Sequence, residues 1–183
     1  MMLFTGIRHE IYFISANSPG SLHDSDVLHS SNLFVKMLSE GWRPFPGCVI
    51  LGDSGYPGLY PFLATPYLPA VAKTDPRKKQ YNDAFVPARS NVERSIGIFK
   101  AKFQSLKSGL RLPEPVQCTR VIEILAAIHN FVIRANNPED ELDAAEKEEI
   151  ERQIQEKAWI NDEPFINDRN AVQTRDRILQ NYF

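Results

Sequence analysis

The 183-residue sequence contains only two cysteines, Cys48 and Cys118, which form neither a metal-binding spacing nor a disulfide framework. Both stand in apolar runs, so we expect buried thiols in a protein of a reducing compartment. No stretch approaches the roughly 20 apolar residues that a membrane span needs. The apolar run at the N-terminus is too short for a signal peptide. These absences predict an intracellular protein with no transmembrane segment.

The sequence also has little net charge, −2 at pH 7, but its charges are unevenly distributed. Residues 73–120 carry eleven Lys and Arg against four Asp and Glu, whereas residues 138–157 carry nine acidic against three basic residues. This pattern is typical of a polyanion-binding body with a solvated or regulatory extension. Two solvated helix faces would give the same charges. The length and the 43% hydrophobic content fit one domain with a real core, with or without an appended tail.

Two apolar segments in the first third of the chain predict β-strands. Residues 10–16 are rich in β-branched and aromatic side chains, and residues 47–51 form a short interior strand. Asp53 stands just after the second strand, where open α/β sheets place their ligands. Five prolines between residues 56 and 85 predict a long surface loop. Within it, Arg77, Lys78 and Lys79 would suit a phosphate backbone, although basic triplets are more often simply solvated.

Helical periodicity follows on both sides of this region. We expect a helix over about 25–39, in which Asp24 is the N-cap, a metal ligand or both. A second helix over about 87–106 places Glu93 at the edge of its buried face. Taken alone, Glu93 is most simply the partner of Arg89 in an ion pair. A carboxylate at a strand end that faces a helix carboxylate is, however, how proteins build magnesium sites for phosphate chemistry, which favours Asp53 with Glu93.

The rest of the chain also predicts helices. Residues 116–136 have a wide apolar face that is typical of a core helix, in which His129 is a satisfied core histidine rather than a ligand. The acidic stretch from 138 is expected to be helical through about 159, and residues 171–183 to form a last short helix.

Three segments in order resemble the PIF/Harbinger-type DDE superfamily endonucleases, which are transposases and nucleases derived from them. They are residues 18–25 (SPGSLHDS), 51–57 (LGDSGYP) and 89–100 (RSNVERSIGIFK). The elements Tyr81-Asn82 and 128–131 (IHNF) also fit, so the resemblance covers about residues 11–136. It implies an α/β fold with a ribonuclease H-like core, a nuclear or cytoplasmic location, and DNA as the substrate, with or without a separate DNA-binding partner protein.

The resemblance also implies residue roles. The second catalytic Asp of the family falls on Asp53 and its catalytic Glu on Glu93, while Asp24 is a further acidic residue near the metal. These three would bind divalent cations, Mg²⁺ or Mn²⁺, which carry out phosphodiester hydrolysis. Contacts to the DNA backbone, including those that the loop suggests, are expected from basic side chains: Arg77, Lys78, Lys79, Arg89, Arg94, Lys100 and Lys102.

The sequence departs from the family pattern at its start. The first catalytic Asp of the family belongs to a segment upstream of everything present, so we expect an N-terminally truncated domain whose sheet lacks its first strands. The expected organisation is a partial nuclease domain at 1–137 and an acidic helical tail at 138–183. Two other readings stay open. One is a domesticated, non-catalytic descendant that binds DNA or protein, and the other is a small scaffold whose carboxylates are only caps and ion pairs.

Overall fold

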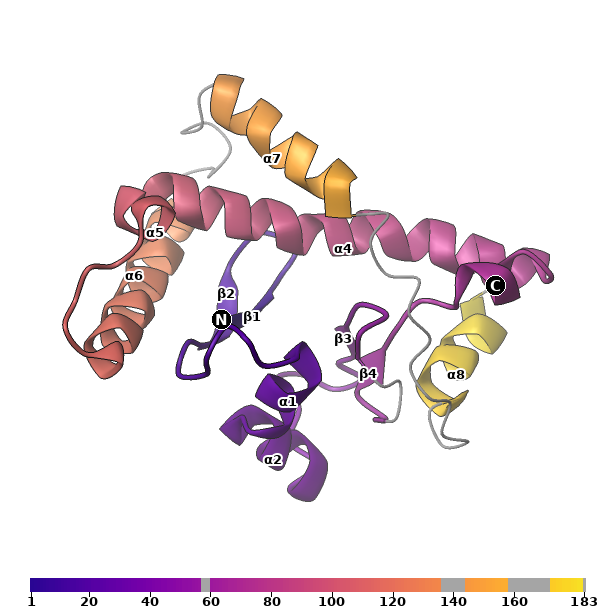
Figure 1. Ribbon diagram of the computed structural model, residues 1–183. Helices are drawn as coiled ribbons and strands as arrows, with labels where there is room; N and C mark the ends of the chain where they lie inside the picture. The colour runs from indigo at the N-terminus through magenta and orange to yellow at the C-terminus, as the bar shows by residue number, and fades with distance from the viewer. Residues whose placement is uncertain (57–59, 136–143, 158–171, 183) are drawn as a thin grey trace. The chain divides into compact units, whose positions relative to one another are not determined.

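The computed structural model describes residues 1–56, 60–135, 144–157 and 172–182 (Figure 1). The described part is a mixed α/β chain in which helices predominate over short strands. By its contacts the chain divides into two compact units. Unit 1 comprises Met1–Ser21 with Ser90–Ala158, and unit 2 comprises Leu22–Arg89 with Trp159–Phe183. Both units combine segments from the two sides of residue 137, and the organisation into a domain at 1–137 and a tail at 138–183 stays a prediction.

A β-hairpin forms the start of unit 1. β1 (Met2–Thr5) pairs antiparallel with β2 (Ile11–Ser15), and the register shifts between Phe4 and Thr5. The rings of Phe4 and Phe13, which lie directly opposite each other, stack with their centroids 5.6 Å apart. β2 confirms the strand predicted at residues 10–16, whereas β1 was not predicted.

The core helix of unit 1 is α6 (Pro115–Ala135), which confirms the helix predicted at 116–136. Its Ala126 packs with Ile11 of the hairpin and Phe99 of α4. His129 is fully buried, and its Nε2 lies 3.0 Å from the carbonyl oxygen of His9. Its partnered Nε2 confirms that His129 is a core residue. The sequence does not reveal that Nδ1 of the same ring is buried without a hydrogen-bond partner.

By length and composition, α6 is also a helix that could cross a membrane, and it is the one such helix among the residues that the structure describes. The expectation that no stretch of this kind exists was therefore wrong. One such helix is weak evidence for a membrane. α6 packs against β2 and carries the buried His129, but only 11% of its apolar window is buried, and Ile124, Ile128 and Phe131 are exposed, so the wide core-facing surface predicted for this helix is only partly covered.

The acidic helix α7 (Ala144–Lys157) packs on α4 within unit 1, and Figure 1 draws it lying obliquely against α4. Ile150 and Ile154 of α7 form an apolar cluster with Ile98 of α4. Glu151 pairs with Arg94 of α4, and Glu146 lies 3.1 Å from the Nζ of Lys107 in α5 (Gln104–Ser108). The expected helix in the acidic stretch is thus confirmed over these residues; residues 138–143 and 158–159 lie outside the described part.

Unit 2 begins with two helices where the sequence predicted one. α1 (Asp24–His29) and α2 (Asn32–Ser39) are separated because Ser31 adopts an extended conformation and caps α2, its Oγ accepting a hydrogen bond from the Phe34 amide. Asp24 is the first residue of α1, and His23 is its N-cap. The N-cap role predicted for Asp24 was therefore wrong.

Two very short strands and three helices complete unit 2. β3 (Ile50–Leu51) pairs in parallel with β4 (Leu63–Ala64) and confirms a strand within 47–51, but it is not the interior strand that was predicted, because Leu51 is 40% exposed. α3 (Pro69–Ala72) follows, and α8 (Val172–Tyr182) confirms the predicted last helix. Leu179 of α8 packs in the same buried cluster as Tyr81 and Phe85.

The longest helix, α4 (Pro76–Lys102), begins eleven residues before the predicted start at residue 87. Pro87, at which the predicted helix began, lies inside α4. Burial of Tyr81 and Phe85 stabilises the helical turns ahead of it, against the missing amide hydrogen bond. The predicted surface loop over residues 56–85 is therefore wrong for β4, α3 and the first turns of α4. Cys48 and Cys118 are half-buried rather than buried.

Candidate functional site

Asp53 lies two residues after β3, and its two carboxylate oxygens have different partners. Oδ1 accepts a hydrogen bond from the Gly55 amide at 2.9 Å, in the turn that follows the strand. Oδ2 lies 3.4 Å from Nη2 of Arg89 on α4. The turn therefore fixes one oxygen, while the longer ion pair leaves the other able to accept a further ligand. This matches the position just after a strand that the sequence predicted for Asp53.

Asp24, at the start of α1, belongs to unit 2 as Asp53 does. Both Asp24 and Asp53 act electrostatically on the Tyr56 phenol. Burial raises the pKa of Tyr56, the charges of the two carboxylates raise it further, and Arg89 opposes them. Four chemically active side chains, from α1, the turn after β3, and α4, thus share one electrostatic environment. The sequence predicted three of them; Tyr56 was missed, although it stands inside the 51–57 segment that carries the resemblance.

Glu93 lies four residues after Arg89 along α4 and is half-buried. It belongs to unit 1, whereas Asp24 and Asp53 belong to unit 2. The structure describes each part of the predicted carboxylate set by itself, so the convergence of all three stays a prediction. Within the ranges that the structure describes, no group of three or more His, Cys, Asp or Glu side chains is arranged to hold a metal ion.

The donor set nevertheless suits a hard cation. Carboxylate oxygens are the ligands that Mg²⁺ and Mn²⁺ prefer, and Mg²⁺ is usually bound by only one or two protein carboxylates together with water and substrate phosphate. Oδ2 of Asp53 and the exposed carboxylate of Asp24 are oxygens of this kind. The two aspartates of unit 2 would therefore hold the cation, and Asp53 would contact both the cation and Arg89.

The seven basic residues predicted for DNA contact all lie on α4, and they differ in exposure and partners. Lys79 pairs with Asp83 at 2.6 Å, and Lys78 lies 3.9 Å from Asp75 and above the ring of Tyr67. Arg77 and Lys100 are exposed, whereas the Nζ of Lys102 is buried. Arg94 pairs with Glu151, as described for α7. Several of the predicted contacts are therefore engaged by acidic or aromatic neighbours within the chain.

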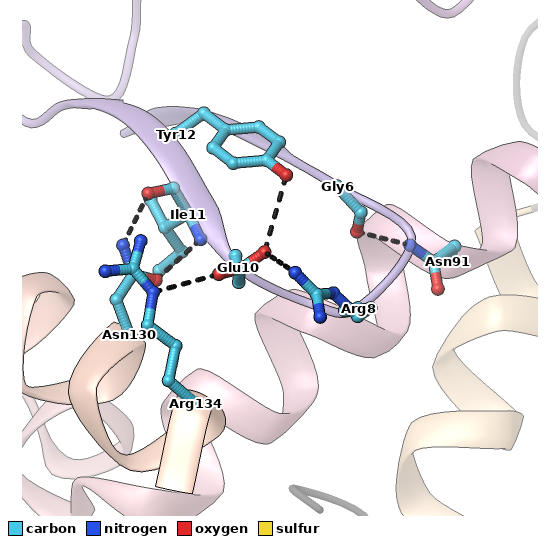
Figure 2. A network of polar contacts seen from close by, with 8 residues as sticks. All are labelled: Gly6, Arg8, Glu10, Ile11, Tyr12, Asn91, Asn130 and Arg134. Carbon is cyan, nitrogen blue, oxygen red and sulfur yellow. Dashed lines mark hydrogen bonds and ion pairs between the residues drawn. The ribbon is translucent and has the colours of Figure 1, made fainter.

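A second polar network was missed by the sequence analysis. It surrounds Glu10, whose carboxylate is buried beside β2 and accepts hydrogen bonds from Arg8, Tyr12 and Arg134 (Figure 2). Asn130, one turn before Arg134 on α6, is part of the IHNF element and binds the hairpin backbone. This element was the one signal that could have directed attention to the contact between α6 and the hairpin.

The comparisons with known proteins agree with the sequence resemblance at the level of the superfamily. The model of one family, described as DDE superfamily endonuclease, matches residues 2–130 of the 183. No curated protein and no solved structure gave a match. The matched region contains Asp24, Asp53, Glu93 and all seven basic residues predicted for DNA contact. Because the match covers more than half of the sequence, this chain belongs to the DDE superfamily endonucleases.

Proposed function

We propose that the chain is a divalent-metal-dependent DNA nuclease of the PIF/Harbinger type, derived from a transposase and built on a ribonuclease H-like core. Membership of the superfamily supports a nuclease acting on DNA. The observation that carries the assignment to particular residues is the shared environment of Asp24, Asp53, Tyr56 and Arg89 in unit 2. An acidic pair beside an arginine suits a site that must hold a cation and a phosphate together.

In this proposal the carboxylates supply position and charge, and no protein nucleophile is needed. A bound divalent cation would neutralise the scissile phosphate and lower the pKa of the attacking water. Asp53 would hold the cation through Oδ2, and Asp24 would complete its protein ligands within unit 2. Arg89 has two tasks: its ion pair orients Asp53, and its guanidinium would contact a phosphate oxygen of the DNA. Glu93 would join this set one turn further along α4.

The nuclease reading is tested by nicking of supercoiled plasmid DNA by the purified chain, with Mg²⁺, with Mn²⁺ and with EDTA. We expect metal-dependent nicking that Asp53→Asn and Glu93→Gln each reduce by at least 100-fold. Glu40→Gln is the matched control, because Glu40 is an exposed acidic residue of unit 2 at the end of α2. If nicking is equally strong in all four proteins, it comes from a contaminating nuclease and the proposal fails.

A non-catalytic descendant that binds DNA is the second candidate. The observation that favours it is the engagement of Arg94 and Lys107 by α7, which occupies basic side chains that a freely working nuclease would offer to DNA. In that case the chain binds duplex DNA with the same affinity in Mg²⁺ and in EDTA, and no nicking is observed.

A further inference from the structure

Glu10 is a buried carboxylate held by three donors from two elements. Its side chain is only 6% exposed, yet it accepts hydrogen bonds from Arg134 Nε at 3.1 Å and from Arg8 Nη2 and Tyr12 Oη, each at 3.4 Å. Figure 2 shows these donors arranged around Glu10, Arg134 reaching it from α6 and the other two from the hairpin. The hydrogen bond from Arg134 holds the pKa of Glu10 below its ordinary value, although burial opposes this.

The two arginines, in contrast, are at the surface. The side chain of Arg8 is 80% exposed and that of Arg134 is 70% exposed. A guanidinium carries five N–H donors, and each arginine directs one nitrogen at Glu10, so most of their donors face solvent. One negative charge is thus buried and two positive charges are presented outward, which leaves a local surplus of positive charge.

The backbone that carries Arg8 is tightly held. Asn130 binds both the amide and the carbonyl of Ile11, at 2.8 and 2.7 Å, and Asn91 donates to the carbonyl of Gly6 at 2.9 Å. The turn is closed by a hydrogen bond from the Gly6 amide to the Glu10 carbonyl at 3.0 Å. Contacts from α4 and α6 therefore fix both ends of the segment between β1 and β2, so the position of Arg8 is set before any ligand arrives.

Exposed guanidiniums held in place by a shared carboxylate suit an oxyanion with several acceptor oxygens. Arginine forks match phosphate geometry, and preorganisation lowers the entropy lost on binding. Tyr12, 63% exposed, adds an aromatic surface next to the two cations. Given the proposed function, on which this step rests, the phosphate available to such a pair belongs to a nucleic acid backbone.

We propose that Arg8 and Arg134, oriented by Glu10, form a binding site for a backbone phosphate of DNA. The site lies on the hairpin and α6 of unit 1, and it involves none of the basic residues that the sequence suggested. It contributes affinity without reading base sequence, because phosphate contacts carry no sequence information.

The test measures binding of a fluorescent DNA duplex to the full chain by anisotropy at several salt concentrations, in EDTA to prevent cleavage. We expect Arg8→Gln with Arg134→Gln to weaken binding about 10-fold and to reduce the slope of log affinity against log salt by about 1 to 2. Arg120→Gln is the matched control, since Arg120 is an exposed arginine of the same helix outside the cluster. It is expected to change the affinity less than twofold.

Lysine substitutions distinguish phosphate recognition by oriented guanidinium groups from attraction by positive charge alone. Arg8→Lys with Arg134→Lys keeps both positive charges but removes the planar guanidinium groups. We expect this double variant to bind DNA nearly as weakly as the glutamine pair. Full recovery of affinity by lysine would overturn the proposal in favour of unspecific charge. If Arg134→Gln impairs folding, Arg8→Gln alone is decisive, and a two- to fivefold loss is expected from it.

The outcomes also separate this site from the proposed function. If the unmodified chain binds DNA and the glutamine pair binds as well as the Arg120→Gln control, the Arg8–Arg134 site is wrong and the nuclease proposal stands. If the unmodified chain binds no duplex in EDTA or in Ca²⁺, the Arg8–Arg134 site and the nuclease proposal fail together. Binding of inorganic phosphate in the low millimolar range that the glutamine pair loses, without any DNA binding, would assign the site to a free anion and overturn the DNA assignment.

Discussion

Gly97 of α4 lies directly beneath Ile150 of α7, so closely that a Cβ on residue 97 would stand 2.5 Å from Ile150 Cγ1. No ordinary side chain fits in that space. The absent side chain is what allows the acidic helix to approach the basic one and to place Ile150 and Ile154 against Ile98. The Arg94–Glu151 and Lys107–Glu146 pairs depend on the same approach.

Enlarging residue 97 is therefore expected to separate α7 from α4. Gly97→Leu forces the side chain into Ile150, and overpacking of this kind costs about 1–3 kcal/mol. The intrinsic helix preference of leucine offsets this by under about 1 kcal/mol. We expect a lower melting temperature and faster proteolysis within α7. Gly20→Ala is the control, since nothing lies within 4 Å of a Cβ there. An unchanged proteolysis pattern in Gly97→Leu would show that the contact is absent in solution.

Removing the charges of α7 that face basic residues is expected to strengthen DNA binding. Glu146→Gln with Glu151→Gln leaves Arg94 and Lys107 in place but removes their acidic partners. We expect a three- to tenfold gain in affinity for a DNA duplex and a steeper salt dependence, because more cations become available to phosphates. Glu148→Gln, a single exposed charge on the same helix, is the control. Equal affinity of the double variant and the control would contradict this role of α7.

The two hydrogen bonds between the Asn130 side chain and the Ile11 backbone are expected to be a major stabilising contact of unit 1. Asn130→Ala removes a donor and an acceptor that together satisfy the amide and the carbonyl of Ile11. Leaving such backbone groups unpaired costs about 1–3 kcal/mol each when they are buried. We expect a loss of about 2–4 kcal/mol in the free energy of unfolding, measured by urea denaturation. A loss below about 0.5 kcal/mol would show that water replaces the amide without cost.

The free energy of unfolding is expected to decrease in two steps as the pH is lowered, because two buried groups each favour the folded state less at acidic pH. Burial holds the pKa of His129 below its ordinary value, and the charges of Lys102 and His9 act in the same direction, against the hydrogen bond that His129 donates to the His9 carbonyl. The unfolded chain then binds the proton first, so this contribution is present above about pH 6.5 and is lost as the pH falls below it. The lowered pKa of Glu10 gives a second contribution, present above the ordinary value of 4.5 and lost below it.

Melting temperatures between pH 8 and pH 3 check this prediction. His129→Gln keeps a donor for the His9 carbonyl and is expected to flatten the fall in stability below about pH 6.5. A rise in stability on going from pH 7 to pH 5 would contradict the buried, neutral His129.

Elements with a strong local signal were predicted from the sequence, and elements that depend on distant partners were not. α6 and β2 have clear periodicity or composition, so they were expected at nearly the observed bounds. β1 lies in the short apolar run at the N-terminus, which did not by itself indicate a strand, and it pairs with β2. The first turns of α4 were missed because Pro87 signals a helix start, while burial of Tyr81 and Phe85, a tertiary effect, extends the helix past it.

The same limit applies to the candidate site. Asp53 could be located from a strand and a turn, and the structure places it just after β3, in an ion pair with Arg89. Glu10 could not be found in this way. Its significance comes from Arg134, which is 124 positions away in the chain and reaches it only after α6 has packed on the hairpin.

The metal site is the central claim, and thermal unfolding with increasing Mg²⁺ or Mn²⁺ tests it most directly. A cation that binds the folded chain at 100 times its dissociation constant stabilises it by about 2.7 kcal/mol, which is a shift of several degrees. We predict that the unmodified chain and Glu40→Gln show this shift and that Asp53→Asn and Glu93→Gln lose it. A folded, unmodified chain whose melting temperature does not respond to either metal would contradict the account.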